Sequence, residues 1–312
     1  MITESEKLKI KTNEYSKNEF DVSVIIVNWN SGKYLRETVE SLVENSENIA
    51  YELIIADNDS NRDDESYKYI EHLSETWDNF TFVECGENLG FAKANNICMK
   101  LARGRNFLIL NPDVIMHNNV LRILCDYLDN NNNVGMVGPK VLNTDGSFQQ
   151  PCLRGKPYPK DTLFHLVGLA KMFPNCAAFN GYAMWNVDKN SINECWALSG
   201  ACMMVSRSLF EQIGGMDELF FMYQEETDWG LRTKEVGKTV VYNPFAVVTH
   251  YKGVTVQNIQ AKSVLIFTQS MMKFFRKHFW NRYNIVQKMF WTTLIWGNFF
   301  LKYVKLRVFK CK

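Results

Sequence analysis

The chain has 312 residues, of which 46% are hydrophobic, so it is long enough to bury a large core. Its eight cysteines show no C-x-x-C spacing, which argues against a cysteine metal cluster or a disulfide framework and predicts reduced thiols. The net charge of +1 conceals an asymmetry: residues 1–235 carry 22 basic and 34 acidic side chains, whereas residues 236–312 carry 13 basic and none acidic.

The first 20 residues are polar and lack the apolar core of an export signal, so we expect a solvated tail. Four buried strands are then predicted within "VSVIIV", "YELIIA", "FTFVE" and "FLIL". A helix is predicted after Ser31, its expected N-cap, and a second helix is expected to stop at Gly104. The first of these helices has one apolar face, formed by Leu35, Val39, Leu42 and Val43. Strands that alternate with helices imply right-handed βαβ units and a mainly parallel sheet.

The second half of the chain is less regular. A helix closes at "DNNNN", and "VGMVGPKVL" predicts another strand. Residues 143–190 contain a proline-interrupted loop, "QQPCLRGKPYPK", and a short amphipathic helix, "DTLFHLVGLAKMF". The segment "CWALSGACMMVSRSLFEQIGG" predicts a strand and then a helix, and "TVVYNPFAVVTHYKG" predicts one or two strands that end at His250.

The C-terminal segment from Met271 interleaves aromatic residues with lysine and arginine. Its longest uncharged run, between Lys288 and Lys302, has 13 residues, whereas a bilayer span needs roughly 20. Interfacial helices that face anionic lipid therefore fit better than a membrane span. The alternative is a helical cap packed on the body. A nucleic-acid partner is not expected, because the cations alternate with large apolar residues rather than forming a polar basic patch.

Three predicted strands end in unusual polar residues: Asn28-Trp29-Asn30, Asp57-Asn58-Asp59 and Asn111-Pro112-Asp113. One polar strand end is usually a turn. In a parallel α/β sheet, however, ligands bind at the carboxyl ends of the strands, so three such ends predict a site. The chain has no G-x-x-x-x-G-K-[ST], and no G-x-G-x-x-G follows the first strand, so the P-loop and dinucleotide-fold interpretations lack their signatures.

At these motifs the chain resembles the family 2 glycosyltransferases, most closely their rhamnosyltransferase-like branch. The segments "VSVIIVNWNSGKYLRETVESL", "ELIIADNDS", "ENLGFAKANN" and "LILNPDV" resemble the nucleotide-sugar half. The segments "SGACMMVSRSLFEQIGGMDELFFMYQEETDWGLR" and "HYKGVT" resemble the acceptor half. The resemblance covers about residues 21–255 and implies a GT-A fold, with residues 1–20 as a tail and 256–312 as a membrane-associating arm. It also implies an inverting mechanism, a nucleoside-diphosphate sugar donor and a divalent metal.

The resemblance assigns donor-binding roles to the strand ends. Asp57 matches the residue that accepts a hydrogen bond from the pyrimidine N3–H, and its negative charge strengthens that bond. Asn88 and Gly90 begin a loop before a helix, where backbone N–H groups approach phosphate or ribose. The expected donor-binding residues are Asn28, Asn30, Asp57, Asn58, Asn88, Gly90 and Asn111.

Asn111-Pro112-Asp113 stands at the family's D-x-D position, and Asn111 in place of the first aspartate leaves Asp113 as the main metal-binding carboxylate. By the same resemblance, His250 in "HYKGVT" completes the metal shell. The ion would be Mg²⁺ or Mn²⁺, which prefer hard oxygen donors and combine few carboxylates with substrate phosphates.

The acidic run in "YQEETDW" holds Glu225, Glu226 and Asp228. Such a run is commonly a solvated helix start. Here aromatic neighbours bracket it, and clustered carboxylates raise one another's pKa, which suits a general base. The family usually has aspartate where this chain has Glu226, which we assign as the base. Glu225 and Asp228 are expected to orient it or to bind the acceptor.

The expectation is an inverting glycosyltransferase that uses dTDP-rhamnose, or else a UDP-sugar, in cell-surface polysaccharide synthesis. Its acceptor would be a lipid-linked saccharide, and the enzyme would lie peripherally on the inner, cytoplasmic face of the membrane. One alternative is a catalytically inactive protein that binds nucleotide sugars or acts as a scaffold. A nucleotidyltransferase is a second alternative, but its glycine-rich basic loop after the first strand is missing.

Overall fold

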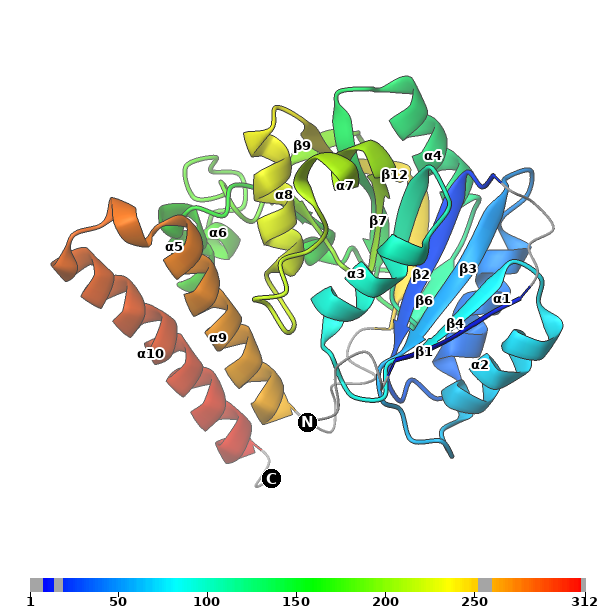
Figure 1. Ribbon diagram of the computed structural model, residues 1–312. Helices are drawn as coiled ribbons and strands as arrows, with labels where there is room; N and C mark the ends of the chain where they lie inside the picture. Colours follow the sequence, from blue (N-terminus) through cyan, green and yellow to red (C-terminus); the bar gives the residue numbers. More distant parts are fainter. Residues whose placement is uncertain (1–7, 14–18, 252–259, 310–312) are drawn as a thin grey trace.

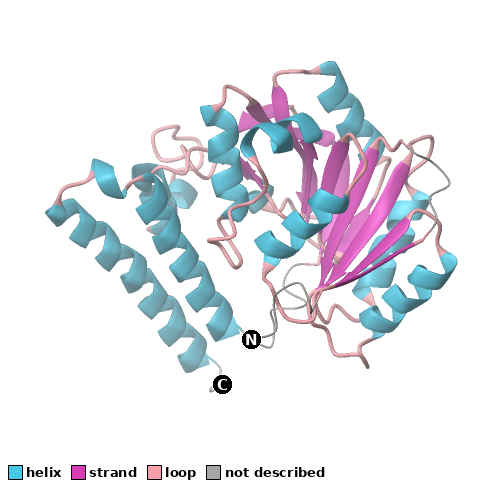
Figure 2. Cartoon of the chain, in the orientation of Figure 1, coloured by secondary structure: helices cyan, strands magenta, loops and turns pink. Residues whose placement is uncertain are grey.

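The computed structural model describes residues 8–13, 19–251 and 260–309. A large mixed sheet forms the centre of the body, and helices cover both of its faces (Figure 1). A helical hairpin stands beside this body, next to α8 and α5, as the helices in Figure 2 show. The expected boundary of the arm, between residues 255 and 256, lies outside the described residues.

Half of the sheet is parallel, as the strand–helix alternation predicts. Its strands lie in the order β4 (Phe80–Glu84), β3 (Tyr51–Asp57), β2 (Val22–Asn28) and β5 (Asn106–Leu110). These are the four predicted strands, and they are buried because helices cover them on both faces. The covering helices are α1 (Tyr34–Glu44), α2 (Glu65–Thr76) and α3 (Phe91–Leu101). The sequence did not lead us to expect α2.

The other half of the sheet is mixed. Strand β11 (Cys202–Ser206) runs antiparallel between β5 and β7 (Val134–Leu142). Strand β12 (Thr239–His250) is one long strand that pairs in parallel with β7 and antiparallel with β6 (Val114–Met116) and β9 (Asn193–Cys195). Helices α4 (Val120–Asn130), α7 (Arg207–Ile213) and α8 (Glu225–Glu235) complete the body.

The region before β9 is built from short elements. They are η2 (Gln150–Cys152), β8 (Leu153–Arg154), α5 (Pro159–Leu166) and α6 (Leu169–Met172). Strand β8 pairs with β10 (Ala197–Leu198) in a separate two-stranded sheet. The predicted amphipathic helix is divided into α5 and α6 because Gly168 adopts the left-handed conformation, with φ of 82°.

Several local predictions were wrong. Ser31 does not cap α1, because the helix begins after Lys33 and the Ser31 hydroxyl donates to Asn28 Oδ1 instead. Val43 is 52% exposed and lies off the buried face of that helix. Helix α3 ends at Leu101, before Gly104. Gly104 lies so close to β2 that an added Cβ would come within 2.4 Å of the Ser23 nitrogen.

The predicted solvated tail is also corrected in part. Within it, β1 (Lys9–Thr12) adds an antiparallel edge strand to β4, and Phe20 is buried. The side chains of β1 are exposed, so sequence composition alone resembles that of a tail. The free backbone edge of β4 accounts for its pairing.

The arm folds into α9 (Gln260–His278), η4 (Trp280–Arg282) and α10 (Ile285–Phe309). Helix α9 packs on the body through a second apolar cluster, which comprises Phe220, Leu231, Met272, Phe274, Phe275, Phe279 and Ile295. Helix α10 lies outside α9, away from the sheet (Figure 1). Among the described residues, no helix combines the length and the apolar character that crossing a bilayer requires.

Candidate active site

The ends of β2 and β3 are joined by Asn28, which pairs with Asp57 in the strand register. Its buried amide donates to Asp57 Oδ1 at 2.9 Å, to Ser60 Oγ at 3.1 Å and to Ser66 Oγ at 3.0 Å. The Ser60 backbone N–H donates to the other Asp57 oxygen at 3.0 Å. Asn28 and Asp57, predicted to share a pocket, are therefore brought together at the carboxyl edge of the sheet.

Burial raises the pKa of the Asp57 carboxyl, although hydrogen bonds from Ser60 and Asn28 act in the opposite direction. Asn30 also belongs to this cluster. It adopts a φ of 47°, its backbone N–H donates to Ser60 Oγ, and its side-chain oxygen accepts from the Asn61 N–H. These bonds hold Asp57 and Asn30 in one fixed arrangement before any ligand binds.

A second cluster holds the loop before α3. Asn58 accepts from the Leu89 N–H at 2.8 Å and donates to Asn88 Oδ1 at 3.1 Å. Gly90 donates to the same Asn88 oxygen. With φ of 81°, Gly90 packs against Phe221, whose carbonyl oxygen would lie 2.4 Å from an added Cβ. Only glycine fits here, so Gly90 joins this loop to the segment before α8 rather than being a plain loop glycine.

We name these two clusters together the donor edge; its members are Asn28, Asn30, Asp57, Asn58, Asn88 and Gly90. Asn111 lies beside them at the end of β5, where its backbone N–H donates to the Ala201 carbonyl at 2.8 Å. Its half-buried side chain makes no hydrogen bond with any described residue. That amide is therefore available to a ligand.

Asp113 and His250, the expected metal ligands, meet between β5 and β12. Asp113 Oδ1 lies 3.3 Å from His250 Nε2, and both side chains are largely buried. Strand pairing enforces this approach, because β6 and β12 place Val114 opposite His250. The backbone carbonyl of Asp113 also accepts from the Tyr251 N–H.

Gln149 fixes the orientation of His250. Its amide nitrogen donates to Asn143 Oδ1 at 3.0 Å and to the His250 carbonyl at 3.4 Å, so its oxygen faces His250 Nδ1 at 2.9 Å. Because an amide oxygen only accepts, the neutral ring carries its proton on Nδ1 and its lone pair on Nε2.

The lone pair of His250 Nε2 and a carboxylate oxygen of Asp113 then face each other. In this neutral form the nitrogen and the carboxylate oxygen are two acceptors 3.3 Å apart, a pair that fits a divalent ion. No group of three or more histidine, cysteine, aspartate or glutamate side chains able to hold a metal occurs among the described residues. Further ligands would have to come from phosphate and water, as is usual for Mg²⁺.

Glu225 and Glu226 begin α8, and we call them the acid pair. Glu226 Oε1 accepts from Arg154 Nη2 at 2.9 Å, and each side chain is 12% exposed. Arg154 also donates to Thr227 Oγ1 and to the Leu198 carbonyl. Three buried atoms here have no hydrogen-bond partner, namely Glu225 Oε2, Glu226 Oε2 and Arg154 Nε. Unsatisfied buried polar atoms are rare and mark a place where a polar ligand group would fit.

Burial and then the negative charge of Glu226 raise the pKa of the Glu225 carboxyl well above its usual range. This raised pKa favours the protonated form of Glu225 beside Glu226. Tyr223 and Gln224, just before the pair, have φ of 69° and 74°. Non-glycine residues in this conformation are strained, and such strain is concentrated at functional sites.

Asp228 is completely buried and faces the arm. Its oxygens accept from Arg232 Nε at 2.7 Å, Lys277 Nζ at 2.5 Å and His278 Nε2 at 2.7 Å. Burial would raise the pKa of Asp228, but hydrogen bonds from His278 and Lys277 and the charge of Arg232 lower it to about 2. These contacts link α8 to α9, and the expected role of Asp228 in orienting the base or binding the acceptor stays a prediction.

The three parts of the site are joined by short connections. The segment from Leu198, which accepts from Arg154, to Ala201, which accepts from Asn111, has four residues and spans at most about 11 Å between its end Cα atoms. Phe221 lies a few residues before the acid pair. Its carbonyl oxygen accepts from the Phe91 N–H, and its side chain packs against Gly90. The acid pair and the Asn111 end of β5 therefore lie within reach of one substrate.

Sequence reasoning missed Arg154 and Gln149. Both lie in the proline-interrupted stretch that we interpreted only as a loop. A lone arginine or glutamine in a polar loop carries no periodic signal. Their importance comes from long-range contacts with Glu226 and His250, which one sequence does not reveal.

The sequence profile of glycosyl transferase family 2 matches residues 23–214. The low-salt glycan biosynthesis hexosyltransferase Agl10 of Haloferax volcanii is 28% identical over 218 residues, which cover 69% of this chain and 62% of the archaeal protein. The N-acetylglucosaminyl-diphospho-decaprenol L-rhamnosyltransferase of Mycobacterium tuberculosis is 29% identical over 240 residues, which cover 73% of this chain and 75% of that protein.

Among solved structures, the mannosyltransferase PcManGT from Pyrobaculum calidifontis, in complex with GDP-Man and Mn²⁺, is similar with a TM-score of 0.55. It is 16% identical, and the match covers 86% of this chain and 67% of the other. GalNAc-T7 with UDP, GalNAc and Mn²⁺ gives a TM-score of 0.56 at 18% identity, with 76% of this chain and 44% of the other covered. The expected GT-A fold is confirmed.

Proposed function

The chain belongs to glycosyltransferase family 2, and from that premise we propose that it is a metal-dependent, inverting enzyme that glycosylates a lipid-linked saccharide. The observation that carries the proposal is the state of Glu226. Its carboxylate is buried, held by Arg154, and left with one oxygen that has no partner among the described residues. A general base needs such a free, fixed oxygen.

In this proposal the donor edge holds the nucleotide. Asp57 keeps acceptor capacity on both oxygens beyond its bonds to Asn28 and Ser60, which suits the N3–H of a pyrimidine. Asn111 contributes its free amide beside the diphosphate. A divalent ion bound by Asp113 and His250 would neutralise the charge that develops on the leaving diphosphate.

Glu226 Oε2 accepts the proton of the acceptor hydroxyl, and the freed oxygen attacks the anomeric carbon. The bond between that carbon and the diphosphate oxygen breaks, and the nucleoside diphosphate leaves with the electron pair. Because attack and departure take place on opposite faces of the sugar, the configuration is inverted. Arg154 holds Glu226 in line for this transfer and keeps its charge compensated.

The choice of donor and acceptor is supported by the names of relatives. The mycobacterial relative is an L-rhamnosyltransferase acting on N-acetylglucosaminyl-diphospho-decaprenol, and a 23% identical relative is the rhamnosyltransferase WbbL of Escherichia coli. We therefore place dTDP-rhamnose first among donors, before UDP-hexoses and UDP-galactofuranose. The acceptor proposed is a lipid-linked saccharide in polysaccharide synthesis.

Helix α10 supports association with an anionic membrane. Large apolar side chains line its outer side, and each is at least 39% exposed: Ile285, Val286, Met289, Phe290, Trp296, Phe300, Leu301 and Val304. Their spacing groups them on one broad face of the helix. Residues 236–312 add only positive charge. We propose that this face lies in the interface of the inner leaflet, on the cytoplasmic side.

The test is incubation of the protein with Mn²⁺, labelled dTDP-rhamnose or UDP-hexoses, and prenyl-diphosphate saccharides in anionic vesicles. Transfer of label to the lipid fraction, lost in EDTA, is the expected result. A protein that binds the nucleotide sugar tightly but never transfers it, with any acceptor, would instead be the inactive binding or scaffold protein.

A further inference from the structure

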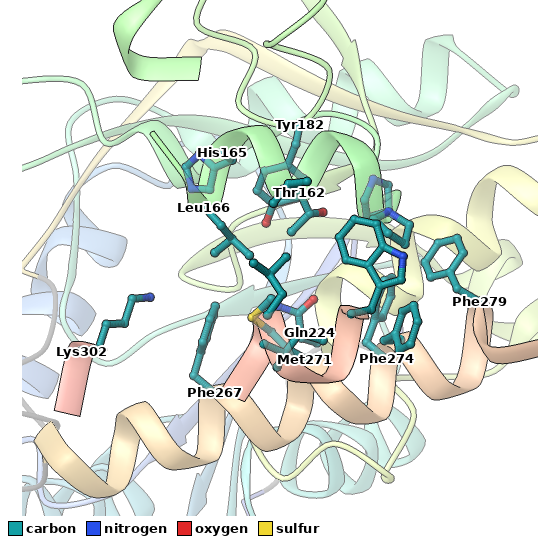
Figure 3. Close-up of a pocket in the computed structure, with 17 residues that line it drawn as sticks. Thr162, His165, Leu166, Tyr182, Gln224, Phe267, Met271, Phe274, Phe279 and Lys302 are labelled. Carbon is teal, nitrogen blue, oxygen red and sulfur yellow. The ribbon is translucent and has the colours of Figure 1, made fainter. Parts of the chain in front are cut away.

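An open cleft of about 790 Å³, including its mouth, lies between the body and the arm. Figure 3 shows α5 on one side and α9 on the other, with Lys302 of α10 at one end. The walls are mainly apolar and aromatic, with Leu163, Leu166, Phe267, Met271, Phe274 and Trp291 among them. Such walls suit a hydrocarbon chain, which leaves water on binding.

The cleft reaches the acid pair. Gln224, in its wall, directly precedes Glu225, and Tyr182, also in its wall, lies close enough to Arg154 to raise the pKa of that guanidinium. Thr162, Tyr182 and Gln224 bring polar groups to the middle of the cleft (Figure 3). A molecule bound in the cleft would therefore touch residues that contact or adjoin the proposed base.

One end of the cleft is cationic. Lys302 and His165 line that end, and Lys302 Nζ lies 5.3 Å from the centre of the Phe267 ring. Lys302 makes no ion pair with any described residue. No acidic residue occurs anywhere after Glu235. An exposed ammonium group beside apolar walls, without a carboxylate partner, fits an anionic ligand group.

These features together fit one kind of ligand. It has a hydrocarbon chain, a phosphate group joined to that chain, and beyond the phosphate a group with a hydroxyl near Glu226. We propose that the cleft between α5, α9 and α10 binds the prenyl diphosphate part of the acceptor, with Lys302 pairing with its phosphate. The inference rests on the proposed function, because it identifies the acceptor of the same site. It also gives the arm a second purpose beyond membrane contact, since one wall of the acceptor site belongs to the arm.

The experiment measures binding of farnesyl diphosphate to the full chain by calorimetry, with farnesol and inorganic diphosphate as half-ligands. Lys302→Glu reverses the charge, and Leu166→Trp fills the apolar part of the cleft. Lys305→Glu is the matched control, because it makes the same charge change on the same helix at a residue that does not line the cleft. Nucleotide affinity in Mn²⁺ is measured for every variant.

We expect farnesyl diphosphate to bind more tightly than either half-ligand. Losing one charge-assisted contact should weaken it about 10- to 100-fold in Lys302→Glu. Leu166→Trp should weaken both farnesyl diphosphate and farnesol, whereas Lys305→Glu and nucleotide affinity should stay unchanged. Equal binding of farnesyl diphosphate by all variants, or no binding by the wild type, would overturn the proposal that the cleft holds a prenyl diphosphate. Failure to bind nucleotide sugar would count against the proposed function instead, whatever the lipid does.

Discussion

The donor edge and the acid pair are both buried and polar, yet their polar atoms are satisfied to very different degrees. At the donor edge, Asn28 and Asn58 each make several hydrogen bonds within the fold. At the acid pair, one oxygen of each glutamate and the Arg154 Nε have no partner among the described residues. The donor edge is complete by itself, whereas the acid pair is left incomplete.

This difference has an energetic meaning. A buried polar atom without a partner costs about 1–3 kcal/mol, so the fold tolerates a local loss of stability at the acid pair. Catalytic sites commonly show such losses, because groups placed for a transition state are poorly satisfied in its absence. The contrast therefore predicts that the two regions respond differently to the same chemical substitution.

The largest effect is expected outside both regions, at the metal ligand Asp113. Asp113→Asn keeps the shape of the side chain and removes the only carboxylate that faces His250 Nε2 among the described contacts. Metal assistance to the departure of the diphosphate is worth several kcal/mol of transition-state stabilisation. Its loss should therefore lower turnover about a thousand-fold or more. Circular dichroism should show an intact fold. Full activity of the wild type after EDTA treatment would contradict the metal assignment.

A smaller effect is expected at Gln149, which fixes the tautomer of His250. Gln149→Met removes the acceptor for the Nδ1 proton and should weaken Mn²⁺ binding about 10- to 100-fold, as for other residues that orient metal ligands. Gln149→Glu keeps an acceptor for Nδ1 and adds a negative charge, so it should bind Mn²⁺ more tightly than Gln149→Met. Paramagnetic titration with Mn²⁺ measures both. Equal Mn²⁺ affinity in the two variants would contradict the claim that Gln149 orients His250.

The smallest effect is expected on the free energy of unfolding, when a carboxylate is changed to an amide in each of the two regions. Asp57→Asn places an NH₂ group against the Asn28 amide or the Ser60 N–H and should cost about 1–3 kcal/mol of unfolding free energy. Glu225→Gln mimics the protonated side chain and should leave stability unchanged at low pH. Thermal unfolding across pH measures both.

The sign of the pH dependence follows from the raised pKa of Glu225. A carboxyl whose folded pKa exceeds its ordinary value of 4.5 destabilises the wild type as the pH rises above that value. Glu225→Gln should therefore gain stability relative to the wild type with increasing pH. A Glu225→Gln variant that loses as much stability as Asp57→Asn would remove the contrast between the two regions.

Much of the fold could be predicted because its signals are local. The four parallel strands are continuous apolar runs, and their polar ends indicated the edge where Asn28, Asp57 and Asp113 lie. Strand β1 could not be predicted in this way, since its exposed side chains give no apolar signal and its stability comes from pairing with β4.

The site was predicted less completely. The acid pair was found from its sequence, but the resemblance did not indicate that Asp228 faces Lys277 and His278, about 50 residues away along the chain. Likewise, the sequence did not show that burial and the charge of Glu226 raise the pKa of Glu225, or that Arg154 of β8 pairs with Glu226. Contacts between distant segments decide these roles, and composition does not report them.

The most direct test of the account is the turnover of Glu226→Gln, with donor affinity measured in the same preparation. The substitution keeps the contact to Arg154 within the same shape but removes proton acceptance, so kcat should fall about 10²- to 10⁴-fold. Donor affinity should be retained, because the donor edge makes its bonds without the acid pair. Glu225→Gln should lose less. Wild-type turnover by Glu226→Gln together with an inactive Glu225→Gln would contradict the account and place the base at Glu225.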